Sequence, residues 1–227
     1  MKRIFSVTAA LILAFILASC APAATQSATL SAASTPAGSS ATGPTSGKVV
    51  YKIVSAESQA SYTVVETLFN QNNKINTAIG VTHTVNGEID ADLTTPANST
   101  LGPITIDISQ FVSDSGQRDN FIKRNFLESN KYPTATFVTK TVTGMPTSYT
   151  DGAPYTFQIS GDLTVHNTTQ PVTFDVKAKL TGNTLSGEAT AQVLMSQFGV
   201  GPISLLGILQ TQDPVKLTID FVARPGA

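Results

Sequence analysis

Apolar and polar residues alternate with a period of two through most of the chain after Lys48. The clearest runs are 104–109, 155–160, 172–180 and 215–221, where every second residue is apolar. Successive side chains of a strand point to opposite faces, so the pattern predicts antiparallel strands with one face on a core. Shorter candidate strands are 49–54, 60–65, 79–85, 133–142 and 186–193, which gives eight or nine strands in all. The chain is therefore predicted to fold as an all-β domain.

One segment departs from this alternation. Between Gln117 and Leu127 the apolar residues Ile122 and Phe126 lie four positions apart, and Asp114-Ser115 supplies a candidate helix cap. This spacing predicts one short amphipathic helix of about three turns.

Turn signals separate the strands at Asn86-Gly87, Gly182-Asn183 and Ser186-Gly187. Strands with a single helix and no alternation of strands with helices favour a barrel or a sandwich.

The first nineteen residues have the composition of an export signal. Lys2 and Arg3 precede an apolar run at 4–17, which is shorter than a membrane-spanning helix needs. The run ends in Leu17-Ala18-Ser19-Cys20, which resembles the lipobox of bacterial lipoproteins. That resemblance implies cleavage after Ser19, acylation of Cys20 and an extracytoplasmic location, in the periplasm or on the cell surface. The alternative is a conventional signal peptide followed by a chance cysteine.

Residues 21–47 consist almost entirely of Ala, Ser, Thr, Pro and Gly and carry no charged side chain. Such a segment has too little apolar surface to offset the entropy of ordering it, so we expect a disordered tether that spans roughly 25–30 Å. The predicted organisation is a signal peptide at 1–19, a lipidated Cys20 with its linker at 20–47, and one folded domain at 48–227.

Charge and residue types exclude several functions. Removal of Lys2 and Arg3 with the signal peptide leaves 12 basic against 15 acidic side chains, so no nucleic-acid partner is expected. Cys20 is the only cysteine, and His83 and His166 are the only histidines. We expect His83 to be structural and His166 to lie on a solvated strand face. No motif of a catalytic nucleophile and no metal-binding spacing occurs. The alternating acids Glu88, Asp90 and Asp92 are expected to lie on a solvated strand edge rather than in a calcium loop.

Several ordered motifs resemble the YceI-like family. They are Gln117-Arg118-Asp119-Asn120-Phe121, Asn125-Phe126-Leu127, Lys131-Tyr132-Pro133-Thr134-Ala135-Thr136-Phe137, Ser160-Gly161-Asp162-Leu163-Thr164-Val165-His166, Pro171-Val172-Thr173-Phe174 and Gln197-Phe198-Gly199. One departure is His166-Asn167, where the family usually has His-Gly; Asn tolerates the left-handed backbone of a tight turn. The connection at 70–76 is also longer and more polar than the family pattern suggests.

This resemblance implies a single lipocalin-like antiparallel β-barrel of about eight strands with one short helix. Its interior would hold a long isoprenoid chain, such as a polyprenyl or quinone tail, with no resident cofactor or metal. Three functions remain in competition at this point: a carrier of isoprenoids or other lipids, a protein-interaction module with a filled core, and a hydrolase. The carrier needs an apolar lumen, whereas the hydrolase needs a triad that the sequence lacks.

Candidate residues for the apolar lumen are the inward-phase aromatics and one apolar loop. The aromatics are Phe137, Phe157, Phe174 and Phe198, with Phe121 and Phe126 expected to close one end and Leu205 and Leu206 expected at the mouth. Leu205 and Leu206 belong to the apolar segment 198–209, which contains several glycines. Two interpretations fit this segment equally well: a loop folded on the core, or an apolar flap at a barrel mouth. Burial of an isoprene unit contributes about 3–4 kcal/mol before ordering costs, so binding needs no charged clamp on the head group.

Overall fold

One antiparallel sheet forms most of the molecule. The computed structural model describes residues 47–205 and 207–226, so the predicted signal peptide, Cys20, nearly all of the predicted tether, Leu206 and Ala227 lie outside the described residues. The strands are β1 (Lys48–Ile53), β2 (Gln59–Leu68), β3 (Lys74–Thr82), β4 (Val85–Asn86), β5 (Glu88–Asp92), β6 (Thr100–Leu101), β7 (Ile104–Asp107), β8 (Thr134–Thr143), β9 (Pro154–Val165), β10 (Thr168–Thr181), β11 (Thr184–Leu194), β12 (Ser204–Leu205) and β13 (Leu209–Pro225). The helix is α1 (Gly116–Asn125). The all-β domain with one helix is confirmed.

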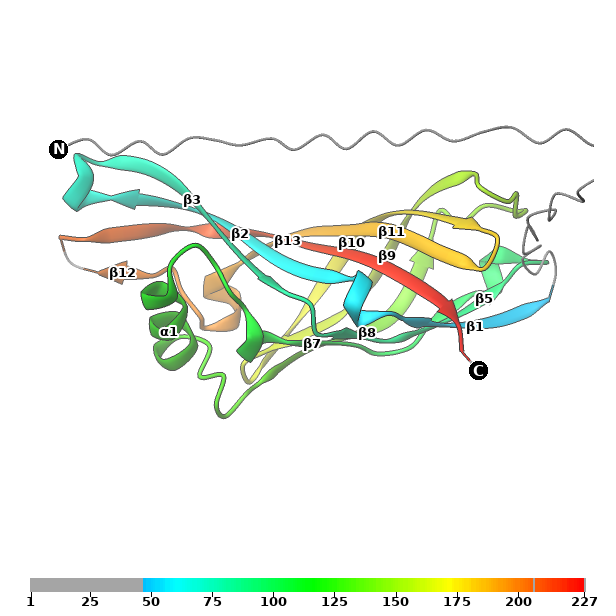
Figure 1. Cartoon of the computed structure of the whole chain (residues 1–227), viewed down its shortest axis with the longest axis horizontal. Helices are drawn as coiled ribbons and strands as arrows, with labels where there is room; N and C mark the ends of the chain where they lie inside the picture. The colour runs from blue at the N-terminus through cyan, green and yellow to red at the C-terminus, as the bar shows by residue number, and fades with distance from the viewer. Residues whose placement is uncertain (1–46, 206, 227) are drawn as a thin grey trace, which may run out of the picture. The chain divides into compact units, whose positions relative to one another are not determined.

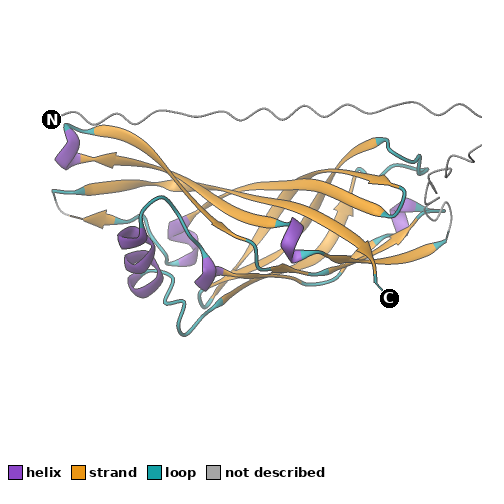
Figure 2. Cartoon of the chain, in the orientation of Figure 1, coloured by secondary structure: helices purple, strands orange, loops and turns teal. Residues whose placement is uncertain are grey.

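The sheet curls into a half-barrel (Figure 1, Figure 2). Its strand order is β4-β7-β8-β9-β10-β11-β13-β1-β5-β6, and every neighbouring pair is antiparallel. The 17-residue β13 organises the centre, because it pairs with β11 along one edge and with β2 and then β1 along the other. β2 in turn pairs with β3, and β12 pairs with the start of β13. The concave face of this sheet is where a lumen is expected.

Inward and outward residues alternate as predicted along the central strands. In β10, Val172, Phe174 and Val176 are buried, whereas Thr173 and Asp175 between them are exposed. The buried members join Phe137, Leu163 and Phe198 in the main hydrophobic cluster on the concave face. Burial of the apolar set on one face fixes the register, since a slip of one residue would turn the whole set to solvent.

Two glycines inside strands allow the sheet to curl tightly. A Cβ atom at Gly161 in β9 would lie 2.2 Å from the Val138 carbonyl oxygen, and one at Gly187 in β11 would lie 2.3 Å from the Lys177 carbonyl oxygen. Only glycine fits such close backbone approaches, which accompany sharp bends in strands. The sequence interpretation of Ser186-Gly187 as a turn is therefore wrong; the β10–β11 turn lies at Gly182-Asn183, and Gly182 has a φ of +57°.

The predicted helix is confirmed, beginning one residue earlier and ending two residues earlier than expected. Ser115 is its N-cap, and the Ser115 side chain accepts a hydrogen bond from the Arg118 backbone N–H at 3.4 Å. Lys123 and Arg124 in the last turn suit the negative end of the helix dipole. α1 lies at the same end of the sheet as β12 and the β2–β3 hairpin (Figure 1). Within the described ranges, no helix is long and apolar enough to cross a membrane.

Strand boundaries differ most from the prediction around the β2–β3 hairpin. β3 already begins at Lys74, inside the segment 70–76 that was interpreted as a polar connection. Its residues Ile75 and Ile79 face outward and are 63% and 49% exposed, so hydrophobicity does not mark the buried face there. The described residues form thirteen strands rather than eight or nine, partly because β4, β6 and β12 have only two residues each, too few to show a period.

Candidate functional site

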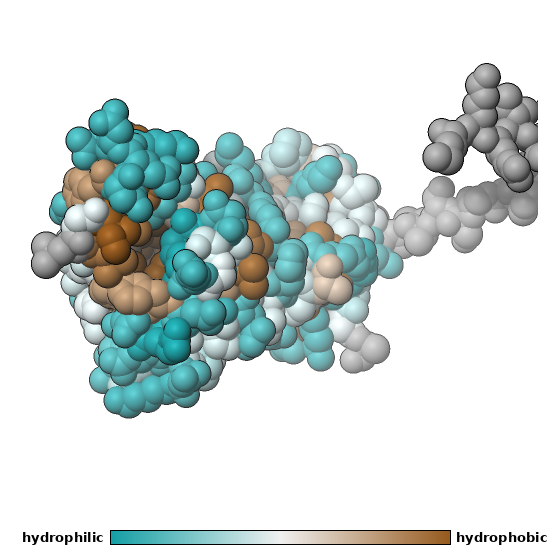
Figure 3. All heavy atoms as spheres, turned by 60° about the vertical axis from the view of Figure 1, so that its left-hand side comes forward, coloured by the Kyte–Doolittle hydropathy of each residue, from teal (hydrophilic) through white to brown (hydrophobic). Residues whose placement is uncertain are grey.

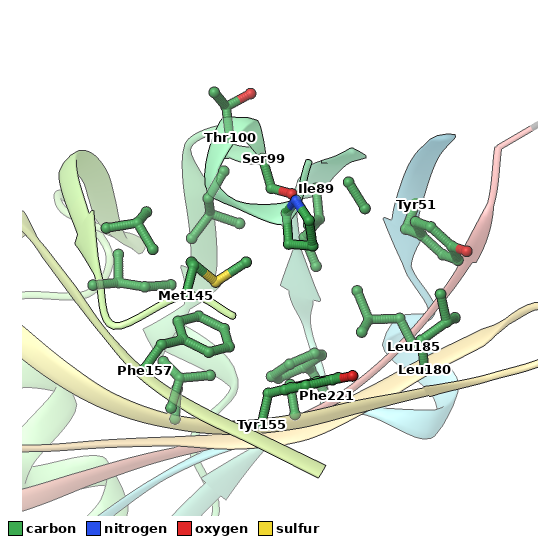
Figure 4. A pocket seen from close by; sticks show the side chains of 18 of the residues that line it. Tyr51, Ile89, Ser99, Thr100, Met145, Tyr155, Phe157, Leu180, Leu185 and Phe221 are labelled. Atoms are coloured by element: carbon green, nitrogen blue, oxygen red, sulfur yellow. The ribbon is translucent and has the colours of Figure 1, made fainter. Parts of the chain in front are cut away.

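A small cavity of about 180 Å³ lies on the concave face of the sheet. Figure 4 shows Met145, Phe157, Leu180, Leu185 and Phe221 around it, contributed by β9, β10, β11, β13 and the loop after β8. Ile89 of β5 and Tyr51 of β1 border the same space, and the Tyr51 side chain is fully buried. The lining is almost wholly apolar, which suits a hydrocarbon and offers little to a polar group.

A larger cavity of about 800 Å³ opens at the end of the sheet that carries α1. Its walls come from β2, β3, α1, β11, β13 and the described part of the segment 195–209, and include Val64, Ile122, Val193, Ile203 and Leu217. Figure 3 brings this end forward and shows apolar residues gathered in a hollow that hydrophilic residues surround. This volume lies in the usual range of about 300–1,000 Å³ for small-molecule sites.

The two cavities share one wall. Phe137 of β8, Phe174 of β10 and Ile219 of β13 line both spaces. The Phe137 and Phe174 rings pack edge to face, with centroids 5.0 Å apart and planes at 78°, and both side chains are buried. The half-barrel therefore holds two apolar compartments in series, with an aromatic pair between them.

The structure brings most of the predicted lumen residues to these compartments. Phe137 and Phe174 line both, Phe157 lines the small one, and Phe121, Phe198 and Leu205 line the large one. Phe126 lines neither cavity and packs against Phe121 instead, with ring centroids 5.7 Å apart. Leu206 lies outside the described residues. The sequence thus located the walls of the lumen, whereas whether these residues contact a ligand stays a prediction.

Each interpretation of the segment 198–209 holds for part of it. Phe198 and Ile203 are 2% and 6% exposed and fold onto the core. Leu205 in β12 pairs with Leu209 in β13 and, together with Ile208, borders the large cavity. Ile208 is 48% exposed. The segment is therefore an anchored hairpin whose outer part forms the rim of the large cavity.

A buried ion pair forms one wall of the large cavity. Glu66 of β2 is 2% exposed and lies 3.2 Å from Nη1 of Arg118 on α1. Asn76 of β3 donates a second hydrogen bond to the same Glu66 oxygen, Oε1, at 2.7 Å. Arg118 also donates to Asp114 and, at 3.0 Å, to the Ser113 hydroxyl. This cluster joins the helix to the sheet at the cavity and was not predicted from the sequence.

The charges of this cluster affect the pKa of the neighbouring Tyr62 side chain. Tyr62 of β2 borders the large cavity, and its ring meets Phe111 edge to face at 5.1 Å. Burial, reinforced by the nearby Asp119 carboxylate, raises the pKa of Tyr62 to about 12 despite the opposing effect of Arg118. Asp119 is itself buried and accepts hydrogen bonds from the Ser113 backbone and hydroxyl. The phenol is thus held neutral in a negative environment.

The polar cluster was missed from the sequence although two signals were present. Glu66 lies in phase with the inward-facing Ala60 and Val64, so the alternation predicts that its carboxylate points toward the core. A buried carboxylate needs a partner, and Arg118 stands in the motif at the start of the helix. The partner was not evident because 51 residues separate the two positions along the chain.

The two histidines lie away from both cavities. His83 falls between β3 and β4, is exposed, and has its Nδ1 atom 3.0 Å from the Ser58 carbonyl oxygen. His166 is not on a solvated strand face; it forms the β9–β10 turn, and its ring lies 4.4 Å from that of Tyr132. The left-handed residue of this turn is His166, with a φ of 59°, rather than Asn167.

The predicted acidic edge is solvated only in part. Glu88 and Asp90 of β5 are exposed, as expected. Asp92 is buried, and its Oδ1 atom accepts hydrogen bonds from the backbone of Thr94 and Thr95. Over residues 47–205 and 207–226, no three His, Cys, Asp or Glu side chains are grouped as a metal site requires.

Comparisons with known proteins agree with this architecture. Crystal structures with the same fold include BcnA of Burkholderia cenocepacia (TM-score 0.58, 20% identity, 75% of this chain and 98% of that one). A polyisoprenoid binding domain from Saccharophagus degradans is also similar (TM-score 0.56, 10% identity, 78% and 99%). So is a YceI protein of Campylobacter jejuni (TM-score 0.51, 20% identity, 63% and 82%).

The family assignment rests on a match of sequence rather than of fold. A search of curated proteins found no match. The family model of the YceI-like domain matches residues 51–223, which is most of the chain and nearly all of the half-barrel. This chain therefore belongs to the YceI-like domain family.

Proposed function

We propose that this protein binds a long apolar isoprenoid, or a lipid of similar shape, inside its half-barrel, and holds it outside the cytoplasm as a carrier, store or sensor. The observation that carries the proposal is the pair of apolar compartments that share the wall of Phe137 and Phe174. A structural relative with the same fold is described as a polyisoprenoid binding domain, which supports this ligand class.

The size and lining of the compartments suit such a chain. A dry cavity of about 150 Å³ holds benzene, so each carbon atom takes about 25 Å³. On that scale the small compartment, about 180 Å³, holds roughly one isoprene unit, and the large one, about 800 Å³, holds at most about six. Each buried CH₂ contributes about 0.8 kcal/mol, so a few buried units suffice for micromolar binding.

The interaction-module alternative fits less well. It requires a filled core, and the two cavities in the half-barrel do not meet that requirement. A binding role also fits better than a catalytic one, because Glu66 and Arg118, the charged pair in the cavity wall, are engaged with each other. Their hydrogen bonds are structural rather than directed at a reacting group.

Binding is tested with geranylgeraniol, a C20 isoprenoid alcohol, in competition with the uncharged dye N-phenyl-1-naphthylamine. An added dye is needed because the chain has no Trp to report binding. We expect the alcohol to displace the dye at micromolar concentration and Leu205→Asp at the cavity rim to weaken it at least tenfold. Val138→Asp is the matched control, since Val138 is exposed and borders neither cavity. Equal binding by both variants, or none by the wild type, contradicts the proposal.

Attachment to the membrane is the second part of the proposal. Two or three acyl chains on Cys20 would anchor the protein stably, whereas a single chain holds a protein only marginally. We expect Cys20→Ser to move the protein from the membrane fraction to the soluble fraction in its own host. Mass spectrometry of the wild-type N-terminal peptide checks the modification directly. An unmodified Cys20, or a variant that stays in the membrane fraction, contradicts lipid anchoring.

A further inference from the structure

The charged residues that line the large cavity constrain the head group of its ligand. Among the described lining residues, those that carry charge are Glu66, Lys74, Asp114 and Arg118. Lys74 stands exposed at the start of β3. Arg118 is the cation inside the wall, with 15% of its side chain exposed. An anionic head group bound within the cavity would therefore depend on Arg118.

Arg118 is already paired with two carboxylates of the chain itself. Its Nη1 atom lies 3.2 Å from Glu66, its Nη2 atom donates to Asp114, and the same Nη2 reaches the Ser113 hydroxyl at 3.0 Å. Diphosphates and carboxylates are held in proteins by free, bidentate guanidinium groups. Both terminal nitrogens of Arg118 already have partners in the chain, whereas its buried Nε atom has none among the described residues. No two neighbouring nitrogens are therefore free for a bidentate contact.

The remaining charge at this wall is negative. The buried Glu66 and the exposed Asp114 contact Arg118 directly, and the buried Asp119 accepts hydrogen bonds from the neighbouring Ser113, so three carboxylates lie near one guanidinium. Like charges repel strongly where burial removes the screening effect of water. Burial is the main reason that the pKa of Tyr62 is raised, and Asp119, Glu66 and Asp114 raise it further against the opposing effect of Arg118.

We infer that the large cavity takes apolar chains whose head group is uncharged, such as a quinone ring or an alcohol, and rejects chains that end in a diphosphate or a carboxylate. The amides of Asn70, Gln71 and Gln117 also border the cavity and can donate to or accept from a neutral head group. An ammonium head group gains little, because Arg118 already occupies the space between the carboxylates. This inference rests on the proposed function and specifies its ligand.

Two probes with the same tail separate head-group charge from chain binding. Geranylgeraniol and geranylgeranyl diphosphate are compared by dye displacement on the full chain. We expect the alcohol to bind at least tenfold more tightly. In Glu66→Gln, which keeps a polar side chain of the same shape, diphosphate binding should tighten at least fivefold relative to alcohol binding. Glu88→Gln removes the same charge from exposed β5 and should change neither affinity.

Asp114→Asn serves as a second variant if Glu66→Gln unfolds, because Asp114 is 79% exposed and its loss does not empty a core position. It should also strengthen diphosphate binding, by a smaller factor. Wild-type protein that binds the diphosphate as tightly as the alcohol overturns the inference, as do Glu66→Gln and Asp114→Asn variants that behave like Glu88→Gln. Failure of both probes to bind instead contradicts the proposed function, so the two failures are distinguishable.

Discussion

The two compartments of the half-barrel are built from one sheet but differ in chemistry. The small compartment is lined by residues such as Phe157, Leu180 and Phe221 and is almost wholly apolar. The large compartment shares the wall of Phe137 and Phe174 but ends in the buried Glu66–Arg118 pair. The difference gives the lumen a direction, because a hydrocarbon tail is favoured at one end and a polar head at the other.

This difference comes from the strands that face each compartment. The inward series of β10 is apolar from Val172 to Leu180, with Val172, Phe174 and Val176 all buried. The inward series of β2 changes along the strand, from Ala60 through Val64 to the carboxylate of Glu66. The same alternation therefore gives an apolar wall in β10 and a polar end in β2, because different residue types occupy the inward positions of the two strands.

Removal of the shared wall should have the largest effect. Phe174→Ala deletes a buried aromatic ring, which typically costs about 3–5 kcal/mol of unfolding free energy. It also joins the two compartments, so the affinity for a C30 isoprenoid alcohol should rise relative to that for geranylgeraniol. Urea denaturation and dye displacement measure the two effects.

Phe157→Ala is the control for the wall, because Phe157 borders only the small compartment and is half-buried. It should cost less stability and leave the preference for chain length closer to that of the wild type. The same chain-length preference in wild-type, Phe157→Ala and Phe174→Ala proteins would show that the aromatic pair does not separate the compartments.

Loss of the polar end should have the next largest effect. Arg118→Leu leaves Glu66 buried without its cation, which we expect to cost about 2–3 kcal/mol, below the 3–5 typical of fully buried pairs because part of Arg118 reaches solvent. Lys140→Leu is the matched control, since its ion pair with Asp162 is exposed and should contribute less than 1 kcal/mol. Equal urea midpoints for the two variants would contradict a structural role for the Glu66–Arg118 pair.

A smaller effect concerns Tyr62 at alkaline pH. Its folded-state pKa of about 12 lies above the usual 10.0, so the unfolded chain loses this proton first. The stabilising contribution is complete below pH 10 and falls by about 1–2 kcal/mol as the pH rises toward 12. Tyr62→Phe lacks this titration, so the stability of the wild type relative to the variant should fall over that range. A constant difference between pH 9 and 11.5 would contradict the raised pKa of this buried phenol.

The sequence predicted the walls of the lumen because burial and period coincide there. The alternation of β10 and the aromatics Phe137, Phe157 and Phe198 identify inward positions without knowledge of the fold. The prediction failed where the outward face is also apolar, as at Ile75 and Ile79 in β3. It also failed at Gly187, because a strand glycine that permits a close backbone approach resembles a turn glycine in sequence.

The polar end and the second compartment required the structure. Glu66 meets Arg118 only through the long-range placement of β2 against α1, and no local pattern encodes that contact. Tyr51 and Met145 come from segments far apart in the chain and meet only when the sheet curls. At Phe126 the local pattern was right but the inferred role was not. Its spacing from Ile122 fits the helix, yet its ring packs on Phe121 and borders neither cavity.

The central claim is that the two compartments hold an isoprenoid chain. Organic extraction of folded protein purified from its own host, followed by mass spectrometry, tests this most directly. The account predicts close to one polyprenyl or quinone molecule per chain, with an uncharged head group. Recovery of no such species from protein shown to be folded would contradict it.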